Sequence, residues 1–347
     1  MSNQPWCSSW GVEVTRDGLV ESFHHVAACA LDERGNVIFS AGDVDAPVFL
    51  RSTAKPFIAA TAIEAGARER FSLEPHEIAV MAASHTGQPF HIDAVRSILR
   101  KIGMHESSLL CGPHAPYNEE AAQQLRAAGI TPGPVYNNCS GKHAGILALC
   151  VLTGADPRTY LEPQNPAQIK ILELCARVSG QRVADFVLGV DGCGIPVYAT
   201  PLRNAALSFM HLATLKGIDE RDAAALQIVR DAMIAHPEYV SGTGEFDTRL
   251  MLAGAGSVAT KGGAEGVSGT AFIGAGVGLV CKVLDGAARG RAPAVLSAIR
   301  QLGLLPESAL TNLADLERPV VYNRAGRAVG EVRAASTVAI LKASTSI

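Results

Sequence analysis

Ser52 and Lys55 are the first pair of side chains in this sequence that could carry out chemistry. They stand in the segment RSTAKPF (residues 51–57), at the start of a helix predicted over residues 52–67. Positions i and i+3 share one face of a helix, so the hydroxyl and the amine can meet. A serine hydroxyl needs a base to take its proton, and burial near the positive end of a helix favours the neutral amine that could do so.

Pro56 fixes Lys55 close to the start of the helix, because proline is tolerated only in a first turn. Penicillin-binding proteins and serine β-lactamases place their nucleophile in a Ser-x-x-Lys motif of this kind. The alternative is structural: Ser52 would cap the helix and Lys55 would be solvated.

A second serine and a second lysine repeat these residue types farther along the chain. Ser84 lies in ASHTG (residues 83–87), either a loop that enters a site or a helix cap. Lys261 lies in TKGG (residues 260–263), a glycine-rich loop before a predicted strand, where a solvated lysine is the alternative. Penicillin-recognising enzymes carry a Lys-Thr-Gly motif in the corresponding order, but this chain has no Ser-Asp-Asn motif and Gly262 replaces the hydroxyl. A β-lactam carboxylate would therefore lose a partner.

Two cysteines on glycine-flanked turns form the third constellation. Cys139 and Lys142 lie in NNCSGKHAG (residues 137–145), and Cys193 lies in VDGCGIP (residues 190–196). Two thiolates with an adjacent lysine or His143 could bind zinc, with water or substrate in the fourth position. An inert buried thiol and a reactive redox cysteine remain alternatives.

The pattern of apolar residues predicts an α+β fold, with a mixed antiparallel sheet and helices around it. We expect a hairpin over residues 25–40, one buried strand over 270–283 and a second hairpin over 320–341, with the N- and C-terminal strands in one sheet. Helices are predicted over residues 52–67, 75–84, 92–102, 121–129, 134–152 (after a turn), 166–179, 223–235 and 293–302. We see no internal boundary and expect a single domain over residues 1–347.

Composition narrows the range of partners. Hydrophobic residues make up 48% and charged residues 18% of the chain, and the net charge is -3, so a large core is expected and a nucleic-acid partner is not. There is no signal-like N-terminus and no long apolar run, so neither secretion nor a membrane span is expected. The eight scattered cysteines then favour a reduced, cytoplasmic protein in which most of them are buried.

Taken together, these motifs resemble the L-asparaginase II family of the rhizobial type over nearly the whole chain. The resemblance rests on LRSTAKP (residues 50–56), ASHTG, NNCSGKH, GVDGCG (residues 189–194), VSGTG (residues 240–244) and Lys261. It implies a serine β-lactamase/glutaminase-like α+β fold, a homodimer, and hydrolysis of L-asparagine to aspartate and ammonia.

The resemblance also implies roles for individual residues. Ser52 would be the nucleophile and Lys55 its base, and Ser84 and Lys261 would form a second Ser-Lys pair. The predicted substrate-binding residues are Arg51, Asp191, His85 and Asn138, and the predicted Zn²⁺ ligands are Cys139, Lys142 and Cys193. Arg51 and Asp191 suit a zwitterionic substrate, because a guanidinium can bind the α-carboxylate and a carboxylate the α-amine.

Three other functions stay open at this stage. A glutaminase or broader amidohydrolase would use the same residues, because one methylene changes binding by only about 1–3 kcal/mol. A β-lactam-hydrolysing or peptidase relative is opposed by the missing Ser-Asp-Asn motif. A zinc-binding redox sensor without turnover would need only the cysteines.

Overall fold

The computed structural model describes residues 8–335, so Cys7 and residues 336–341 of the expected C-terminal hairpin lie outside it. The chain packs as two compact units, each built from separate stretches of sequence. Unit 1 holds the residues up to Leu50, Thr200–Thr214 and the residues from Arg249 onward, and unit 2 holds Arg51–Ala199 and Leu215–Thr248. Since the chain passes between the units four times, no single change in composition marks a boundary. The single domain over residues 1–347 stays a prediction.

Unit 1 is built on a curled antiparallel sheet. Within the described residues it has eight strands in the order β10-β11-β1-β2-β9-β8-β7, with β3 paired to β2. The N-terminal β1 pairs with the C-terminal β11, Val12 opposite Ala334, which confirms that the two ends of the chain share one sheet. These strands are β1 (Gly11–Arg16), β2 (Leu19–Leu31), β3 (Val37–Ala41), β7 (Val258–Gly263), β8 (Val267–Phe272), β9 (Val277–Val283), β10 (Val320–Tyr322) and β11 (Ala328–Ala334); β4 (Pro47–Phe49) also belongs to unit 1.

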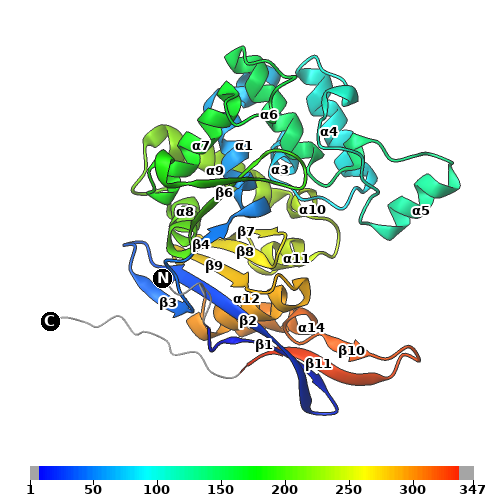
Figure 1. Ribbon diagram of the computed structural model, residues 1–347, viewed down its shortest axis with the longest axis vertical. Coiled ribbons are helices and arrows are strands. Elements are labelled where there is room, and N and C mark those ends of the chain that lie inside the picture. Colours follow the sequence, from blue (N-terminus) through cyan, green and yellow to red (C-terminus); the bar gives the residue numbers. More distant parts are fainter. Residues whose placement is uncertain (1–7, 336–347) are drawn as a thin grey trace. The chain divides into compact units, whose positions relative to one another are not determined.

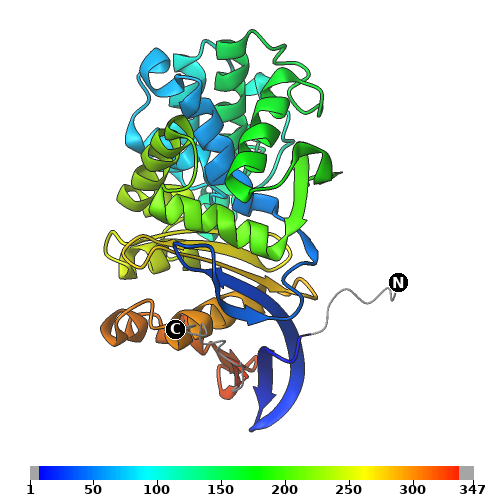
Figure 2. The same ribbon diagram turned by 90° about the vertical axis from the view of Figure 1, so that its left-hand side faces the viewer.

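Helices cover both faces of this sheet. α8 (Leu202–Thr214) packs on β9, β2 and β8, and α12 (Arg291–Leu302) lies on the opposite face against β9 and β11 (Figures 1 and 2). The long strand β2 bends strongly, and its half at Val26–Leu31 is buried between the two layers (Figure 2). The remaining helices of this part are α11 (Phe246–Ala253), which begins in unit 2, α13 (Glu307–Thr311) and α14 (Ala314–Glu317).

The prediction of one continuous strand over residues 270–283 is wrong. The segment is a hairpin, in which β8 ends at Phe272 and β9 begins at Val277. The turn lies at Gly274 and Gly276, and Gly276 has φ 63°, a backbone conformation that glycine adopts at no steric cost. A continuous apolar run hid the turn, because both strands are buried and neither alternates with polar residues.

Unit 2 is helical, and α1 (Lys55–Glu64) lies at its centre. All of its residues except Glu64 are buried, and it packs against α6, α7 and α9 (Figure 1). The other helices of unit 2 are α2 (Ala67–Phe71), α3 (Pro75–Met81), α4 (Pro89–Lys101), α5 (Glu119–Ala127), α6 (Ser140–Thr153), α7 (Pro166–Ser179), α9 (Glu220–Ala235) and α10 (Pro237–Val240). β5 (Val187–Val190) and β6 (Pro196–Pro201) pair as a hairpin, and only the end of β6 passes into unit 1.

These elements confirm the α+β class and the predicted helices, with shifts of a few residues at their ends. The helix expected over residues 52–67 divides into a 3₁₀ turn at Arg51–Ala54 and α1. The sequence reading missed α8, which follows β6 without a break. No helix in the described residues is long and apolar enough to cross a membrane.

The contact between β9 and α8 depends on Gly278. A Cβ at this position would lie 2.1 Å from the backbone N of Met210 and 2.3 Å from the carbonyl O of Ala206. Backbone cannot rotate away as a side chain can, so we expect Gly278→Ala to lower the free energy of unfolding by at least about 2 kcal/mol. Urea denaturation would measure this loss.

Gly274→Ala is the matched control, because a Cβ there meets nothing within 4 Å. It should change the free energy of unfolding by less than about 0.5 kcal/mol. Equal stabilities for the two variants would show that α8 does not hold β9 as described.

Candidate active site

Lys55 is the centre of the polar cluster in unit 2. It is the first residue of α1, and only 1% of its surface is exposed. Its Nζ lies 2.6 Å from the carbonyl O of Ala83, 2.9 Å from Ser84 Oγ and 3.2 Å from Cys139 Sγ. These three polar partners can stabilise the Lys55 amine, which is removed from water at the start of α1.

Burial lowers the pKa of Lys55 from its usual 10.5, and nearby Lys142 lowers it further, while Cys139 and Cys193 act in the opposite direction. The net shift favours the neutral amine. A neutral amine has a lone pair, and the Ser84 hydroxyl can donate to it. The site therefore holds a candidate base next to a candidate proton donor.

The expected contact between Ser52 and Lys55 is not found. In the described part of the chain no hydrogen bond joins their side chains; Ser52 lies in the 3₁₀ turn before α1, and Lys55 is the first residue of α1. Ser52 is half-buried. The hydroxyl that pairs with Lys55 comes instead from Ser84, a combination that spacing along the sequence could not indicate.

The loop after α3 that carries Ser84 is held by the segment after α10. This second segment includes part of the VSGTG motif. A Cβ on Gly242, which has φ 149°, would lie 2.2 Å from Thr86 Oγ1, so only glycine fits there without movement. Hydrogen bonds that join the segments include Ser84 N to Val240 O, Thr86 N to Ser241 O and Thr243 N to Gln88 Oε1, each 2.9 Å.

Cys139, Lys142 and Cys193 meet although they come from two distant segments. Cys139 caps α6, Lys142 lies in its first turn, and Cys193 lies on the turn between β5 and β6. Lys142 Nζ is 2.7 Å from Cys193 Sγ, and Cys139 Sγ is 3.2 Å from Lys55 Nζ. Gly141 lets α6 approach α3 closely, since a Cβ there would lie 2.1 Å from Val80 O.

The two thiols have opposite pKa shifts. The hydrogen bond from Cys193 lowers the pKa of Cys139 well below its usual 9.0, with Lys142 and Lys55 acting in the same direction. The same hydrogen bond and burial raise the pKa of Cys193. Burial alone would lower the pKa of Lys142, but the charges of the two sulfurs outweigh it and raise that pKa. These shifts favour the thiolate form of Cys139 and the ammonium form of Lys142.

This donor set is compatible with zinc. Two sulfurs and one amine converge from the positions predicted as ligands, and thiolate is a preferred zinc donor. Among the described residues no group of three or more His, Cys, Asp or Glu side chains is arranged to hold a metal, so the third protein donor would have to be Lys142. His143, the rival ligand, is bound elsewhere: its Nδ1 lies 2.6 Å from Tyr160 Oη.

Arg51 and Asp191 form an ion pair beside this cluster. Arg51 Nε and one terminal nitrogen each lie 2.9 Å from Asp191 Oδ1. Although burial acts to raise the pKa of Asp191, Lys142, the Gly192 N–H and Arg51 together hold it below its usual 3.8. Arg51 has φ 50°, which is uncommon for a residue with a Cβ and directs the chain into the 3₁₀ turn that carries Ser52.

A small cavity connects the ion pair to the buried lysines. Its volume is about 10 Å³, room for about one water molecule. The polar residues of its lining are Arg51, Lys55, Lys142, Asp191 and Tyr198, and its apolar residues include Ile58, Ile195 and Val197. An amino acid would therefore have to displace the Arg51 side chain or move the β5–β6 turn.

His85 and Asn138, the two other residues predicted to bind substrate, differ in burial. His85 is completely buried, its Nε2 lies 2.9 Å from Ser140 Oγ, and its ring stacks on His91. Burial lowers its pKa well below 6.5, so it packs as a neutral support under the Ser84 loop. Asn138 is half-buried and its carbonyl O accepts from His85 N. Substrate contact by either residue stays a prediction.

Lys261 lies in unit 1, whereas the residues of this cluster belong to unit 2. It is on strand β7 opposite Gly269, only 1% exposed, with Nζ 2.6 Å from Gly262 O. The expectation of a loop lysine is therefore wrong, because a glycine-rich segment here pairs as a strand. Its pairing with Ser84 stays a prediction.

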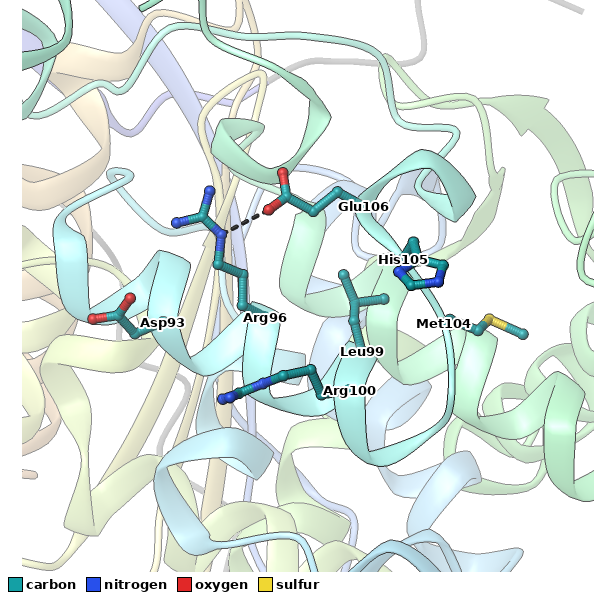
Figure 3. A pocket seen from close by; sticks show the side chains of 7 residues that line it. All are labelled: Asp93, Arg96, Leu99, Arg100, Met104, His105 and Glu106. Atoms are coloured by element: carbon teal, nitrogen blue, oxygen red, sulfur yellow. Dashed lines mark hydrogen bonds and ion pairs between the residues drawn. The ribbon is translucent and has the colours of Figure 1, made fainter. Parts of the chain in front are cut away.

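A roomier hollow of about 460 Å³ lies between α4 and the following loop (Figure 3). Arg96 and Glu106 neutralise each other across it at 2.7 Å. None of the residues predicted to act in catalysis lines this hollow. The candidate site is therefore identified by its reactive side chains and not by the volume of its cavity. Its lining is Asp93, Arg96, Leu99, Arg100, Met104, His105 and Glu106.

Comparison with known protein families identifies the family of this chain. The sequence model of the L-asparaginase II family matches residues 12–334. The chain therefore belongs to the L-asparaginase II family, which places it broadly among the amidohydrolases. No curated protein matches the chain.

Solved structures of Mglu resemble the fold at low sequence identity. Mglu in its glutamate form is 16% identical with a TM-score of 0.45, covering 81% of this chain and 61% of that one. Another Mglu structure is 16% identical with a TM-score of 0.44, covering 81% of this chain and 67% of that one. The structure of native Mglu in the presence of 4.3 M NaCl is 16% identical to this chain, with a TM-score of 0.42. The match covers 80% of this chain, which spans only 60% of the length of that Mglu chain. Likeness at this level says nothing about substrate or site residues.

Proposed function

We propose that this protein hydrolyses L-asparagine to L-aspartate and ammonia through an acyl-enzyme on Ser52. The observation that carries the proposal is the buried amine of Lys55, whose lowered pKa and hydrogen bond to Ser84 suit a base. Membership of the L-asparaginase II family supports the reaction class. The rhizobial type of that family is the subgroup whose motifs the chain carries.

In the proposed reaction, Ser52 attacks the side-chain amide of asparagine. Its proton passes to neutral Lys55, either directly or through Ser84, which is 2.9 Å from the amine. The protonated lysine then returns a proton to the departing ammonia, and water hydrolyses the aspartyl ester. Lys261 would assist as the second lysine.

We assign substrate recognition to Arg51 and Asp191. Their ion pair keeps both charges in a nearly closed cavity until a ligand with one carboxylate and one ammonium replaces it. Such an exchange conserves the charge balance, whereas a ligand with only one of these groups would leave a charge unpaired. The site would therefore select free amino acids over peptides. Glutamine is the competing substrate, and the relative rates on asparagine and glutamine decide between them.

We also propose that Cys139, Lys142 and Cys193 hold Zn²⁺. When bound, the metal would supply a Lewis-acidic centre beside the cavity. Lys55 and the serines already supply a base and a nucleophile, so the metal is assigned to substrate binding. A homodimer and a cytoplasmic location stay predictions.

The nucleophile is tested by Ser52→Ala. Removing the hydroxyl that forms the acyl-enzyme should reduce ammonia release to below about a hundredth of the wild-type rate. A coupled ammonia assay measures it. Ser107→Ala, at an exposed serine, should remain fully active. If Ser52→Ala keeps its activity while Ser84→Ala loses it, Ser84 is the nucleophile.

The base is tested by the pH profile. Only neutral Lys55 accepts a proton, so kcat/KM should rise with pH through one ionisation and level off below pH 10.5, because burial lowers this pKa. Lys55→Arg should be inactive because arginine stays charged. Lys170→Arg, on the exposed side of α7, should keep the wild-type profile. An acidic optimum would contradict a lysine base.

The metal is tested by substitution of its donors. Wild-type protein should bind one zinc, and the Cys139→Ala, Cys193→Ala double variant should bind none, because two of three donors are gone. Elemental analysis after dialysis gives the stoichiometry. The metal-free wild type should show a raised KM rather than a lost kcat. Full zinc in the double variant would eliminate this site.

A further inference from the structure

We propose that Tyr198 limits how long a side chain the site accepts, and that Gln168 is the positioning residue that holds Tyr198 in place. With this wall fixed, an amide one methylene longer than asparagine would carry its reacting carbon past Lys55. The substrate, an amino acid bound through Arg51 and Asp191, is that of the proposed function, on which this assignment rests. The discrimination between asparagine and glutamine then belongs to two residues that take no part in the chemistry.

The cavity beside Arg51 and Asp191 extends along β6. At the turn, Asp191 N donates to Ile195 O at 2.9 Å. Tyr198 lies three residues farther along β6, opposite Leu188, and a strand of that length spans about 10 Å. The cavity is lined by every residue from Ile195 to Tyr198. The charged groups that would bind the head of an amino acid therefore lie at one end of this strand, and Tyr198 lies at the other.

Helix α1 supplies another wall of the cavity. Lys55 and Ile58 are three positions apart in α1, so their side chains share one face of the helix, and both line the cavity. Ile58 is 4% exposed and belongs to the central helix of unit 2, which packs against α6, α7 and α9, so it cannot retreat. Ile58 and Tyr198 together would limit the room beyond an amide that lies against Lys55.

A chain of buried hydrogen bonds holds Tyr198 from behind. Its Oη donates to Gln168 Oε1 at 3.3 Å, and Gln168 Nε2 donates to the carbonyl O of Tyr160 at 2.6 Å. Tyr160 Oη accepts from Leu110 N at 2.7 Å and lies 2.6 Å from His143 Nδ1. Apart from Leu110, these residues are at most 2% exposed, so bulk water cannot replace the partners they have in the protein.

The tether fixes the orientation of both side chains. Burial raises the pKa of Tyr198 well above its usual 10.0, so its hydroxyl stays protonated and donates. A reversed Gln168 amide would place its oxygen against the carbonyl O of Tyr160, so only one orientation satisfies both partners. A buried hydrogen-bond network rigidifies the side chains that it joins. Substrate can therefore make space by opening the ion pair of Arg51 and Asp191, but not by pushing Tyr198 back.

The wall is tested by the ratio of kcat/KM on L-glutamine to kcat/KM on L-asparagine, measured by ammonia release from the full-length protein. Tyr198→Leu shortens the wall, so it should raise this ratio by about tenfold or more, the size of effect that one methylene has in an apolar pocket. Tyr322→Leu is the matched control. Tyr322 lies on β10 and is 63% exposed, so this variant should keep the wild-type ratio.

Gln168→Met tests the positioning role. Methionine is about as long as glutamine but makes neither hydrogen bond, so Tyr198 keeps its ring and loses its tether. The ratio should rise by about threefold, as loss of one hydrogen bond allows. Tyr198→Phe removes only the hydroxyl and should give a similar rise. A merely structural role would lower both rates in proportion and leave their ratio unchanged. Thermal unfolding checks that each variant is folded.

Binding of L-aspartate and L-glutamate, measured by calorimetry, probes the same wall without turnover. These ligands have the same head group as the two amides and differ from each other by the same methylene. Tyr198→Leu should raise the affinity for glutamate relative to aspartate by about tenfold. A wild type that releases no ammonia from either amide would reject the proposed function, and the two affinities would still decide the role of Tyr198.

Four results would overturn the role of Tyr198. They are equal kcat/KM of the wild type on the two amides, an unchanged ratio in the folded variants of Tyr198 and Gln168, a rise with Ile58→Ala but not with Tyr198→Leu, and binding of neither amino acid. A rise with Tyr198→Leu but not with Tyr198→Phe or Gln168→Met would keep the wall and reject the tether.

Discussion

The burial of two lysine amines beside two cysteine sulfurs is the interaction on which the site depends. An unpaired ammonium in a protein interior is strongly disfavoured, so each amine needs polar or anionic partners that come from elsewhere in the chain. Lys55 at the start of α1 and Lys142 in α6 are both 1% exposed, and their nearest sulfurs belong to Cys139 and Cys193. The four groups fix how α1, α6 and the β5–β6 turn must meet.

Close backbone contacts make this meeting possible. Small residues bring α6 against α3, as Gly141 shows by its approach to Val80. The loop that follows α3 then presents the Ala83 carbonyl and the Ser84 hydroxyl to the amine of Lys55. Neutral His85 and His91 stack beneath this loop, and burial lowers the pKa of His91 to about 4, so neither adds a charge near Lys55 at neutral pH.

The charges also explain how one cluster could serve both catalysis and metal binding. Two amines beside one thiolate favour the neutral form of one amine and the ammonium form of the other, since Lys55 and Lys142 have opposite pKa shifts. The neutral amine suits a base. The thiolate is the form of cysteine that binds a metal.

The sequence by itself determined the α+β class, most helices and the residue types of the site, because these follow from apolar periodicity and from short motifs. It predicted the pairing of the terminal strands and the convergence of Cys139, Lys142 and Cys193. It did not determine that Lys55 would contact Ser84 instead of Ser52, that Lys261 would lie in a strand, or that residues 270–283 would turn back as a hairpin. Those outcomes depend on contacts between segments far apart in the chain, where packing and the need to satisfy buried polar groups outweigh local spacing.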